Sequence, residues 1–237
     1  MKISIIGLGR FGELLGTSLL KEGHDICGTT RTELKKIKLE DKGFKVSTLN
    51  YPNTPSELLQ AEVIVLNIPP FEKELDWYKS WSWNKKSWII FISSTSVFPV
   101  PDTSGGILLY EQEEWFKNVF PDTTILRFGG LLTKEGHPGK YLSGKTSLKG
   151  RLWPVNLIHL EDTVTATKVV IEKKLKNITA HVVSDEHPTR EEYYSYYCQK
   201  QNLPLPQFDP SDYSQGKIVS SDELKKFYVP KKSIWDE

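Results

Sequence analysis

The sequence has very little cysteine. Cys27 and Cys198 are its only two cysteines, and neither belongs to a Cys-x-x-Cys pair or to a spacing of histidines and cysteines that suits a metal ion. This scarcity excludes a disulfide framework and gives no indication of a metal site. Two isolated thiols are typical of proteins in a reducing compartment, so we expect a cytoplasmic protein.

An excess of one charge is also missing, because 31 Lys and Arg residues stand against 30 Asp and Glu residues. With a net charge of +1, a basic surface for nucleic acid or for an anionic membrane is not expected. The longest apolar runs, such as residues 3–8 and 63–66, have the length of strands and are too short to span a bilayer. The N-terminal segment “MKISIIGLG” is predicted to enter a strand at once, so we do not expect a signal peptide.

The first half of the sequence contains a regular alternation of short β-rich runs and helical stretches. The predicted strands cover residues 2–7, 24–30, 44–49, 61–70, 87–93 and 123–130. Before the fourth of them, a short helix is expected behind Thr54 as N-cap, with Pro55 at the first helical position. Strands separated by helical periods indicate a right-handed βαβ series, and therefore a doubly wound parallel α/β sheet of the Rossmann type.

The alternation ends near residue 130, and residues 129–154 are predicted to form a long loop region because Gly, Pro and Lys dominate them. The elements expected beyond it are a helix over 161–176, a strand over 181–186 and a helix over 189–202. Thr189 and Glu192 have the spacing of a capping box at the start of the last helix. We interpret residues 1–130 as a Rossmann core and residues 131–237 as a small, irregular C-terminal lobe that contributes in part to that core.

A glycine-rich loop follows the first predicted strand. The segment “IIGLGRFGELLG” places Gly7, Gly9 and Gly12 in a Gly-x-Gly-x-x-Gly spacing at the start of a helix. In this context the first glycine allows a tight turn, the second lets the backbone approach a pyrophosphate, and the third lets helix and strand pack closely. The helix N-terminus adds N–H groups and a positive dipole. We therefore predict a dinucleotide site that also includes Arg10 and Phe11.

The end of the second predicted strand decides between the two nicotinamide dinucleotides. An NAD site normally has an acidic residue there for the ribose hydroxyls, but this strand ends in “CGTTR”, and Asp25 lies at its opposite end. Arg31, with the hydroxyls of Thr29 and Thr30, suits a 2′-phosphate instead, so NADP(H) is favoured over NAD(H). The alternative is that Arg31 only begins a solvated helix.

The fourth predicted strand ends in “NIPP”. Because the carboxyl ends of strands line the ligand crevice in such sheets, Asn67 and Pro69 are expected near the cofactor. The predicted cofactor-binding residues are Gly7, Gly9, Arg10, Phe11, Gly12, Thr30, Arg31, Asn67 and Pro69.

Seven segments carry a resemblance to a known family. They are the glycine loop, “GTTR”, “NIPP”, “SSTSVF”, “ILRFGGLL”, “PVNLIHLEDTVTAT” and “VVSDEHPTREEYYSYYCQKQNLPLP”. In this order they resemble the short-chain dehydrogenase/reductase superfamily, above all its extended and atypical NAD-dependent epimerase/dehydratase-like members. The resemblance implies a Rossmann fold, a nicotinamide dinucleotide, a small-molecule substrate and a tendency to form homodimers. It also implies that Ser94, with Thr95 beside it, polarises the oxygen of the substrate.

The resemblance further implies an acid/base tyrosine, followed four residues later by a lysine, on the next helix. Tyr110 is the only tyrosine there and has Glu114 at the lysine position, whereas an alignment on “EQ” puts Thr103 and Ile107 at the two positions. The pair is absent in both alignments. Two functions therefore stay open: an NADP(H)-dependent oxidoreductase or epimerase-type enzyme for a small carbonyl or sugar-like substrate, and a degenerate NADP(H)-binding sensor or regulatory protein.

Five other polar residues are candidates for the site. His159 either transfers protons or is a buried structural residue, and Asp162 is expected in a first helical turn rather than as a catalytic acid. His137 and Lys140 lie in the loop expected to cover the substrate, and they are candidate ligands of an anionic group. Arg127 either reaches the ligand crevice or forms a packing salt bridge.

Overall fold

The computed structural model describes residues 1–49, 54–101 and 103–236. The strands are β1 (Lys2–Ile6), β2 (Asp25–Thr30), β3 (Lys45–Thr48), β4 (Val63–Leu66), β5 (Trp88–Ser94), β6 (Thr124–Phe128), β7 (Gly130–Leu132), β8 (Leu157–His159) and β9 (Thr179–Val182). The α-helices are α1 (Arg10–Lys21), α2 (Glu33–Glu40), α3 (Glu74–Ser80), α4 (Ser104–Val119), α5 (Pro138–Leu142), α6 (Leu160–Lys173), α7 (Arg190–Lys200) and α8 (Asp222–Lys225). The short 3₁₀ helices are η1 (Ser56–Gln60) and η2 (Thr95–Val97).

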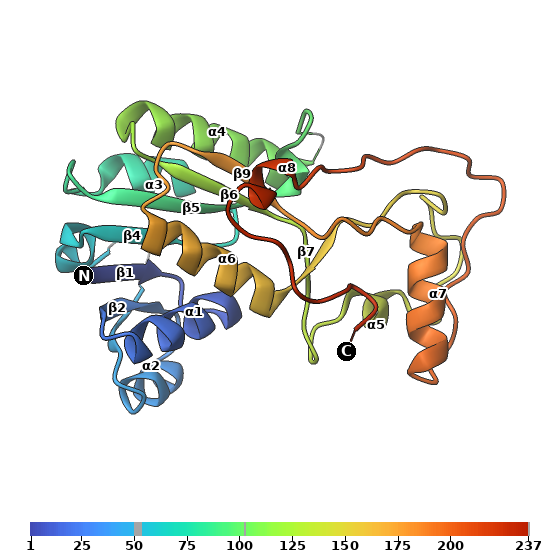
Figure 1. The fold of residues 1–237 in the computed structure, drawn as a ribbon, viewed down its shortest axis with the longest axis horizontal. Coiled ribbons are helices and arrows are strands. Elements are labelled where there is room, and N and C mark those ends of the chain that lie inside the picture. Colours follow the sequence, from blue (N-terminus) through green and yellow to red (C-terminus); the bar gives the residue numbers. More distant parts are fainter. Residues whose placement is uncertain (50–53, 102, 237) are drawn as a thin grey trace. The chain divides into compact units, whose positions relative to one another are not determined.

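The main sheet has the strand order β3-β2-β1-β4-β5-β6-β9. The pairings from β3 through β5 are all parallel. Helices α3 and α4 lie on one face of this sheet, and α1 and α6 lie on the other (Figure 1). The predicted Rossmann-type, doubly wound α/β fold is therefore confirmed. The strand order reverses between β1 and β4, which is where such sheets bind ligands at the carboxyl ends of their strands.

The chain divides into two compact units. The first contains Met1–Arg127 and Val164–Ala180, and the second contains Phe128–Thr163 and His181–Glu237. Most of α6 therefore belongs to the first unit, although residues 128–163, which precede that part of the helix in the chain, belong to the second unit. Its Lys168 forms an ion pair with Glu22, the C-cap residue of α1.

Aromatic side chains from α3, the segment after it and α4 form a cluster on one face of the main sheet. The ring of Tyr78 lies 5.1 Å from that of Trp81 and 5.2 Å from that of Phe116, and the ring of Trp83 lies 5.6 Å from that of Phe116. All four side chains are buried. Tilted and edge-to-face pairs at these distances add to the stabilisation from apolar burial. Part of the chain's large tryptophan and tyrosine content is therefore core.

Two local predictions are wrong. The short helix expected behind Thr54 is the 3₁₀ helix η1, whose N-cap is Pro55, and the buried Thr54 hydroxyl has no hydrogen-bond partner among the described residues. The long loop expected over residues 129–154 contains β7 and α5. Strand β7 forms because it pairs in parallel with β8, and α5 begins at Pro138 behind a cap from His137.

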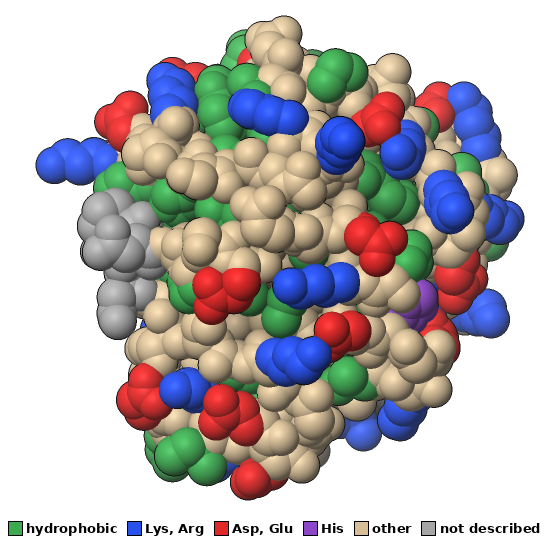
Figure 2. All heavy atoms as spheres, turned by 90° about the vertical axis from the view of Figure 1, so that its left-hand side faces the viewer, with side chains coloured by type: hydrophobic (Ala, Val, Ile, Leu, Met, Phe, Trp, Pro, Cys, Tyr) green, Lys and Arg blue, Asp and Glu red, His purple; other side chains and the backbone are tan. Residues whose placement is uncertain are grey.

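The predicted strand near residue 181 is present as β9, and the predicted capping box of Thr189 and Glu192 starts α7. Among the described residues, no helix is long and apolar enough to cross a membrane. Figure 2 shows one face of the molecule, on which Lys and Arg side chains are interspersed with Asp and Glu side chains. No single sign of charge dominates the face in that view.

Candidate functional site

The glycine loop runs between β1 and α1, beside the reversal of strand order. Gly7 has a φ of +104°, in the region that favours glycine. A Cβ atom at Gly7 would clash with the carbonyl oxygen of Asn67, and one at Gly12 would clash with the carbonyl oxygen of Gly7. Glycine at these positions therefore lets the loop after β1 pass the loop after β4, and lets α1 pack directly against the glycine loop.

Gly9 is in a different environment. It is exposed, and the nearest atom to a Cβ built on it is Nδ2 of Asn67, at 4.0 Å. Gly9 is the N-cap of α1 and provides no side-chain cap, so the N–H groups of the first turn have no acceptor from that residue or within the helix. Arg10 is exposed beside them. Open space, N–H groups and a positive helix end fit a pyrophosphate.

Phe11 was predicted as a cofactor residue, and the structure limits what it can offer. Its side chain is only 3% exposed and belongs to the core. Only the backbone of Phe11, in the first turn of α1, can therefore take part in binding at this loop. Pro69, by contrast, is exposed in the segment after β4.

Two side chains hold the glycine loop in place. The hydroxyl of Thr29 accepts a hydrogen bond from the N–H of Gly7 at 3.0 Å, and Nδ2 of Asn67 donates to the carbonyl oxygen of Gly7 at 3.1 Å. Thr29 is fully buried in β2. The expectation that its hydroxyl faces a 2′-phosphate is therefore wrong, because that hydroxyl is enclosed and already bonded to the loop.

The end of β2 presents Thr30 and Arg31. Thr30 is 8% exposed, whereas Arg31 is exposed and has no hydrogen-bond or ion-pair partner among the described residues. Asp25, at the other end of the strand, forms an ion pair with Lys45 at 2.7 Å. The guanidinium group of Arg31 is thus an available cation at the carboxyl end of β2.

A carboxylate also follows this strand, at Glu33 in the first turn of α2. It accepts a hydrogen bond from the hydroxyl of Thr48 and lies 3.5 Å from the ammonium of Lys36. These contacts, the hydroxyl first, lower the pKa of Glu33. The carboxylate is therefore engaged on the side of β3, and no acidic residue occupies the strand end itself.

The hydroxyl segment, Ser93 to Ser96, begins within the last two residues of β5 and continues into η2. Ser94 is the last residue of the strand and the N-cap of η2, where its Oγ accepts the N–H of Ser96 at 3.2 Å. Ser94 and Thr95 are half-buried, whereas Ser93 is 5% exposed and its Oγ has no hydrogen-bond partner among the described residues. Ser94 Oγ accepts this hydrogen bond through a lone pair, so the O–H of Ser94 remains available to donate to a ligand.

Helix α4 carries the positions at which the resemblance implies a tyrosine and a lysine. Thr103 is the N-cap of α4 and accepts the N–H of Gly106 at 3.0 Å, while Ile107 is 47% exposed. Tyr110 is 44% exposed, and Glu114 forms an ion pair with Lys117 at 3.0 Å. Neither alignment of α4 therefore places a phenol beside an ammonium group.

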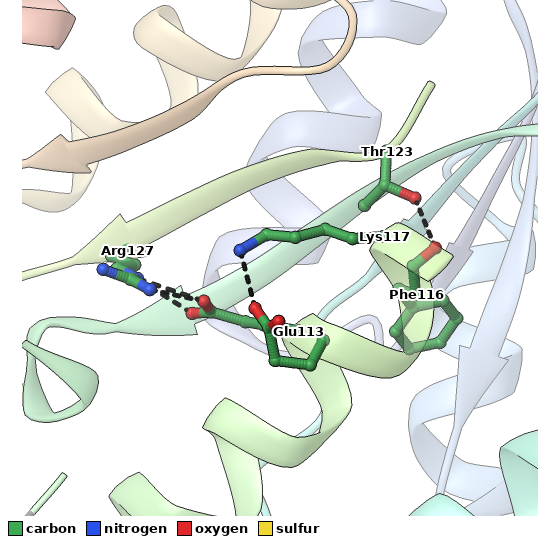
Figure 3. A network of polar contacts seen from close by, with 6 residues as sticks. Glu113, Phe116, Lys117, Thr123 and Arg127 are labelled. Carbon is green, nitrogen blue, oxygen red and sulfur yellow. Dashed lines mark hydrogen bonds and ion pairs between the residues drawn. The ribbon is translucent and has the colours of Figure 1, made fainter. Parts of the chain in front are cut away.

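Arg127 on β6 forms a close ion pair with Glu113 on α4 (Figure 3). The guanidinium donates from Nε to Oε1 at 2.9 Å and from Nη2 to Oε2 at 2.6 Å. The side chain of Glu113 is fully buried, and that of Arg127 is 13% exposed. Arg127 was expected either to reach the ligand crevice or to form a packing salt bridge, and in the structure it forms the salt bridge.

Glu74, at the start of α3, is a polar residue that the sequence analysis missed. Its carboxyl group accepts hydrogen bonds from the hydroxyl of Tyr78 and, at 3.0 Å, from Nε2 of Gln112 on α4. Glu74 is 1% exposed, and burial raises the pKa of its carboxyl group to about 7. The helical spacing of Glu74, Tyr78 and Trp81 puts all three on one face, so their common burial could have been predicted.

The second unit contains the candidate residues His137, His159 and Asp162. His159, in β8, contacts the carbonyl oxygen of Ser233 through Nε2 at 2.8 Å. Asp162 accepts the hydroxyl of Tyr228 and the N–H of Lys231, the latter at 3.0 Å. Both side chains are buried and attach the C-terminal segment to β8 and α6. His159 and Asp162 therefore have structural partners.

His137 is the N-cap of α5, where its Nδ1 accepts the N–H of Gly139 at 3.0 Å. Its ring is stacked on that of Tyr197, with centroids 3.5 Å apart, and its Nε2 lies 3.0 Å from the hydroxyl of Tyr193. The ammonium of Lys140 donates to the carbonyl oxygen of Lys134 at 2.9 Å. His137 thus shapes the local fold, and Lys140 keeps an exposed cation.

Comparisons with known proteins agree with this geometry. The family described as “NADP oxidoreductase coenzyme F420-dependent” matches residues 2–90, which contain the glycine loop and the ends of β2 and β4. Over nearly its whole length the chain is also similar to protein YeeZ of Escherichia coli strain K12, with 28% identity over 94% of this chain and 92% of that protein.

Solved structures resemble the chain over nearly all of its length. UDP-glucuronic acid 4-epimerase from Bacillus cereus, in complex with NAD, has a TM-score of 0.75 at 18% identity, covering 98% of this chain and 94% of its own. A short-chain dehydrogenase/reductase superfamily protein from Agrobacterium tumefaciens, with bound NAD, has a TM-score of 0.73 at 13% identity, covering 98% and 93%. The resemblance inferred from the sequence is confirmed at the level of the fold: this chain has the Rossmann-type fold shared by short-chain dehydrogenase/reductase and epimerase structures.

Proposed function

We propose that the first unit binds NADP(H) at its glycine loop and that the protein is an oxidoreductase or epimerase-like enzyme for a small carbonyl or sugar-like substrate. The observation that carries the proposal is the open space at Gly9, in front of the uncapped N-terminus of α1. A pyrophosphate placed there meets backbone N–H groups and the positive end of the helix dipole.

The preference for NADP(H) rests on Arg31 alone. Its exposed guanidinium, with no partner among the described residues, lies where a carboxylate would receive the ribose hydroxyls of NAD. Two of the similar structures hold NAD, so the comparisons do not supply this preference. A guanidinium forms short, charge-assisted hydrogen bonds with a phosphate, which supports binding of the 2′-phosphate.

Bound NADP(H) supplies hydride transfer, and the hydroxyl residues at the end of β5 position the substrate. The Oγ of Ser94 accepts the N–H of Ser96, so its own proton remains available for a ligand. Donation of that O–H to the substrate oxygen favours hydride addition at the attached carbon, because negative charge develops on the oxygen. With no tyrosine and lysine in the expected positions of α4, proton transfer would come from another group or from water.

A second candidate is a catalytically degenerate NADP(H)-binding sensor or regulatory protein. One observation favours it, namely the residues at the two positions where a tyrosine and a lysine are expected. In one alignment these positions hold the helix cap Thr103 and the exposed Ile107, and in the other they hold Tyr110 and Glu114. Neither set lowers a phenol pKa towards neutrality, which a general acid/base at neutral pH requires.

The loss of NADPH absorbance in the presence of a panel of aldehydes, ketones and keto-sugars separates the two functions. For an enzyme, at least one compound is reduced, and Ser94→Ala lowers kcat by about 10²-fold, the cost of a lost donor to a developing oxyanion. Ser82→Ala is the matched control, because Ser82 is exposed and lies outside the site. NADPH binding without turnover of any compound would contradict the enzyme and favour the sensor.

A further inference from the structure

A cavity lies wholly within the second unit and shares no residue with the proposed cofactor site. Its volume is about 360 Å³, which is within the range of small-molecule pockets. It is lined from β7, α5, β8, α6, α7 and the C-terminal segment, including His137, Tyr193, Tyr196, Tyr197 and Trp235. Side chains from so many segments form a shaped pocket rather than a shallow surface depression.

Aromatic rings form much of the wall. The ring of Trp235 lies 5.2 Å from that of Tyr193 and 5.0 Å from that of Tyr196, to which it is nearly perpendicular. On the other side, His137 is stacked on Tyr197. Rings that hold one another in fixed orientations present preformed faces to a flat apolar group, at little cost in side-chain entropy.

Within this aromatic wall, the polar atoms of Tyr193 and His137 are already bonded to the protein. The hydroxyl of Tyr193 donates to the carbonyl oxygen of Ile234 at 3.0 Å, so it accepts from Nε2–H of His137. Nδ1 of the same histidine accepts the N–H of Gly139, which fixes the neutral tautomer. Burial raises the pKa of Tyr193 and keeps its phenol neutral. These groups therefore offer ring faces and no charge.

The charges that line the cavity come from lysines in excess of carboxylates. Lys134, Lys140, Lys200 and Lys232 stand against Glu161 and Asp236. Glu161 lies 3.5 Å from the ammonium of Lys232, and the carboxylate of Asp236 accepts the N–H of Ser233 at 3.0 Å. Lys134 and Lys140 form no ion pair with a described residue. The ammonium of Lys140 donates only to the carbonyl oxygen of Lys134, so both lysines of the lining keep a positive charge that no described carboxylate neutralises.

We propose that this cavity binds a small aromatic acid, whose ring lies against Tyr196 and Trp235 and whose carboxylate is held by Lys134 and Lys140. A neutral aromatic molecule would leave the charges of the two ammonium groups without a counter-ion. An anion without a ring would leave the aromatic faces exposed to water. A ligand that has both a ring and an anionic group contacts the aromatic faces and the ammonium groups of the pocket at the same time.

Isothermal titration calorimetry with 2-naphthoate tests this site directly. 2-Naphthamide is the neutral isostere, and acetate is the anion without the ring. We expect 2-naphthoate to bind at least about tenfold more tightly than either, the effect of about 1.4 kcal/mol in binding free energy. Equal binding of 2-naphthamide, or no heat from 2-naphthoate up to its solubility, would overturn the proposal.

Variants locate the site. The double substitution Lys134→Ala and Lys140→Ala changes two exposed side chains and is expected to weaken 2-naphthoate about tenfold. Trp235→Leu is expected to weaken 2-naphthoate and to leave the small affinity for acetate unchanged. Lys231→Ala is the matched control, because this exposed lysine does not line the cavity. Unchanged binding in the double variant, or displacement of 2-naphthoate by NADPH, contradicts the proposed location.

Discussion

Nδ2 of Asn67 donates a hydrogen bond to the carbonyl oxygen of Gly7 at 3.1 Å. This contact joins the loop after β4 to the loop after β1, at the reversal of strand order. The backbone carbonyl of Asn67 leaves no room for a side chain at Gly7. The side-chain Nδ2 of Asn67 is the nearest atom to the place that a Cβ atom would take at Gly9. One residue therefore holds the shape of the proposed pyrophosphate site.

Substitution of Asn67 tests this role. Asn67→Ala removes one hydrogen bond to the glycine loop, and we expect NADPH affinity to fall about five- to tenfold, which corresponds to about 1 kcal/mol for one bond. Asn118→Ala, at an exposed position of α4, is the control. The measurement is calorimetric titration with NADPH. An unchanged affinity would show that the loop does not depend on this contact.

The glycines at 9 and 12 are expected to behave in opposite ways. Gly9→Ala adds a methyl group in open space, so stability to urea should change by less than about 0.5 kcal/mol while NADPH binding is lost or strongly weakened. Gly12→Ala brings the methyl group against the carbonyl oxygen of Gly7 and should destabilise the fold by about 1–3 kcal/mol. Equal losses of stability in both variants would contradict this distinction.

The buried carboxyl group of Glu74 predicts a pH dependence of stability. The pKa of this carboxyl group rises from 4.5 in the unfolded chain to about 7 in the folded protein. Between pH 4.5 and pH 7, therefore, the carboxyl group is protonated in the folded state and ionised in the unfolded state. The stability that the group contributes is therefore full below pH 4.5 and is lost as the pH rises towards 7. The total loss is on the order of 3 kcal/mol at 1.4 kcal/mol per pKa unit.

Glu74→Gln keeps the shape of the side chain and removes the titration. Urea unfolding between pH 5 and pH 8 should give a wild-type stability that falls relative to this variant as the pH rises. Asp76→Asn, at an exposed position of the same helix, should keep the wild-type slope. Parallel curves for Glu74→Gln and wild type would show that the carboxyl group does not titrate in this range.

The buried ion pair of Arg127 and Glu113 predicts a strong non-additivity. Arg127→Met leaves a fully buried carboxylate without this partner and should cost about 3–5 kcal/mol of unfolding free energy. The double variant Arg127→Met and Glu113→Leu should recover most of that loss, because no charge remains buried. Lys117→Met, in an exposed pair with Glu114, should cost less than about 1 kcal/mol. Additive losses in the double variant would contradict this account.

Much of the fold could be predicted from local pattern. Buried strands such as β4 and β5 are apolar at nearly every position, and the glycine spacing marks the turn between β1 and α1. Strand β7 could not be predicted, because three residues become a strand only through their pairing with β8. The same holds for α5, whose start depends on a cap from His137 and on contact with α7.

The candidate site shows the same division. The open position at Gly9 and the exposed Arg31 agree with their sequence motifs, since both depend on residue type at a strand end. The direction of a side chain was harder to predict. The hydroxyls of Thr29 and Thr30 were both expected to face a 2′-phosphate, but that of Thr29 accepts a hydrogen bond from the N–H of Gly7 inside the sheet. His137 was expected to meet an anionic substrate, but its two ring nitrogens have protein partners. Gly7 and Tyr193, two of these partners, are distant from Thr29 and His137 in the sequence, so local pattern does not reveal the contacts.

The central claim is that the first unit binds NADP(H) through Arg31, and paired titrations of NADPH and NADH test it most directly. The account predicts that wild-type protein binds NADPH more tightly, and that Arg31→Ala weakens NADPH about 10- to 100-fold with little effect on NADH, as expected for the loss of a charge-assisted contact to the 2′-phosphate. Lys38→Ala, at an exposed position of α2, should change neither affinity. Tighter binding of NADH by the wild type, or unchanged NADPH affinity in Arg31→Ala, would contradict the claim.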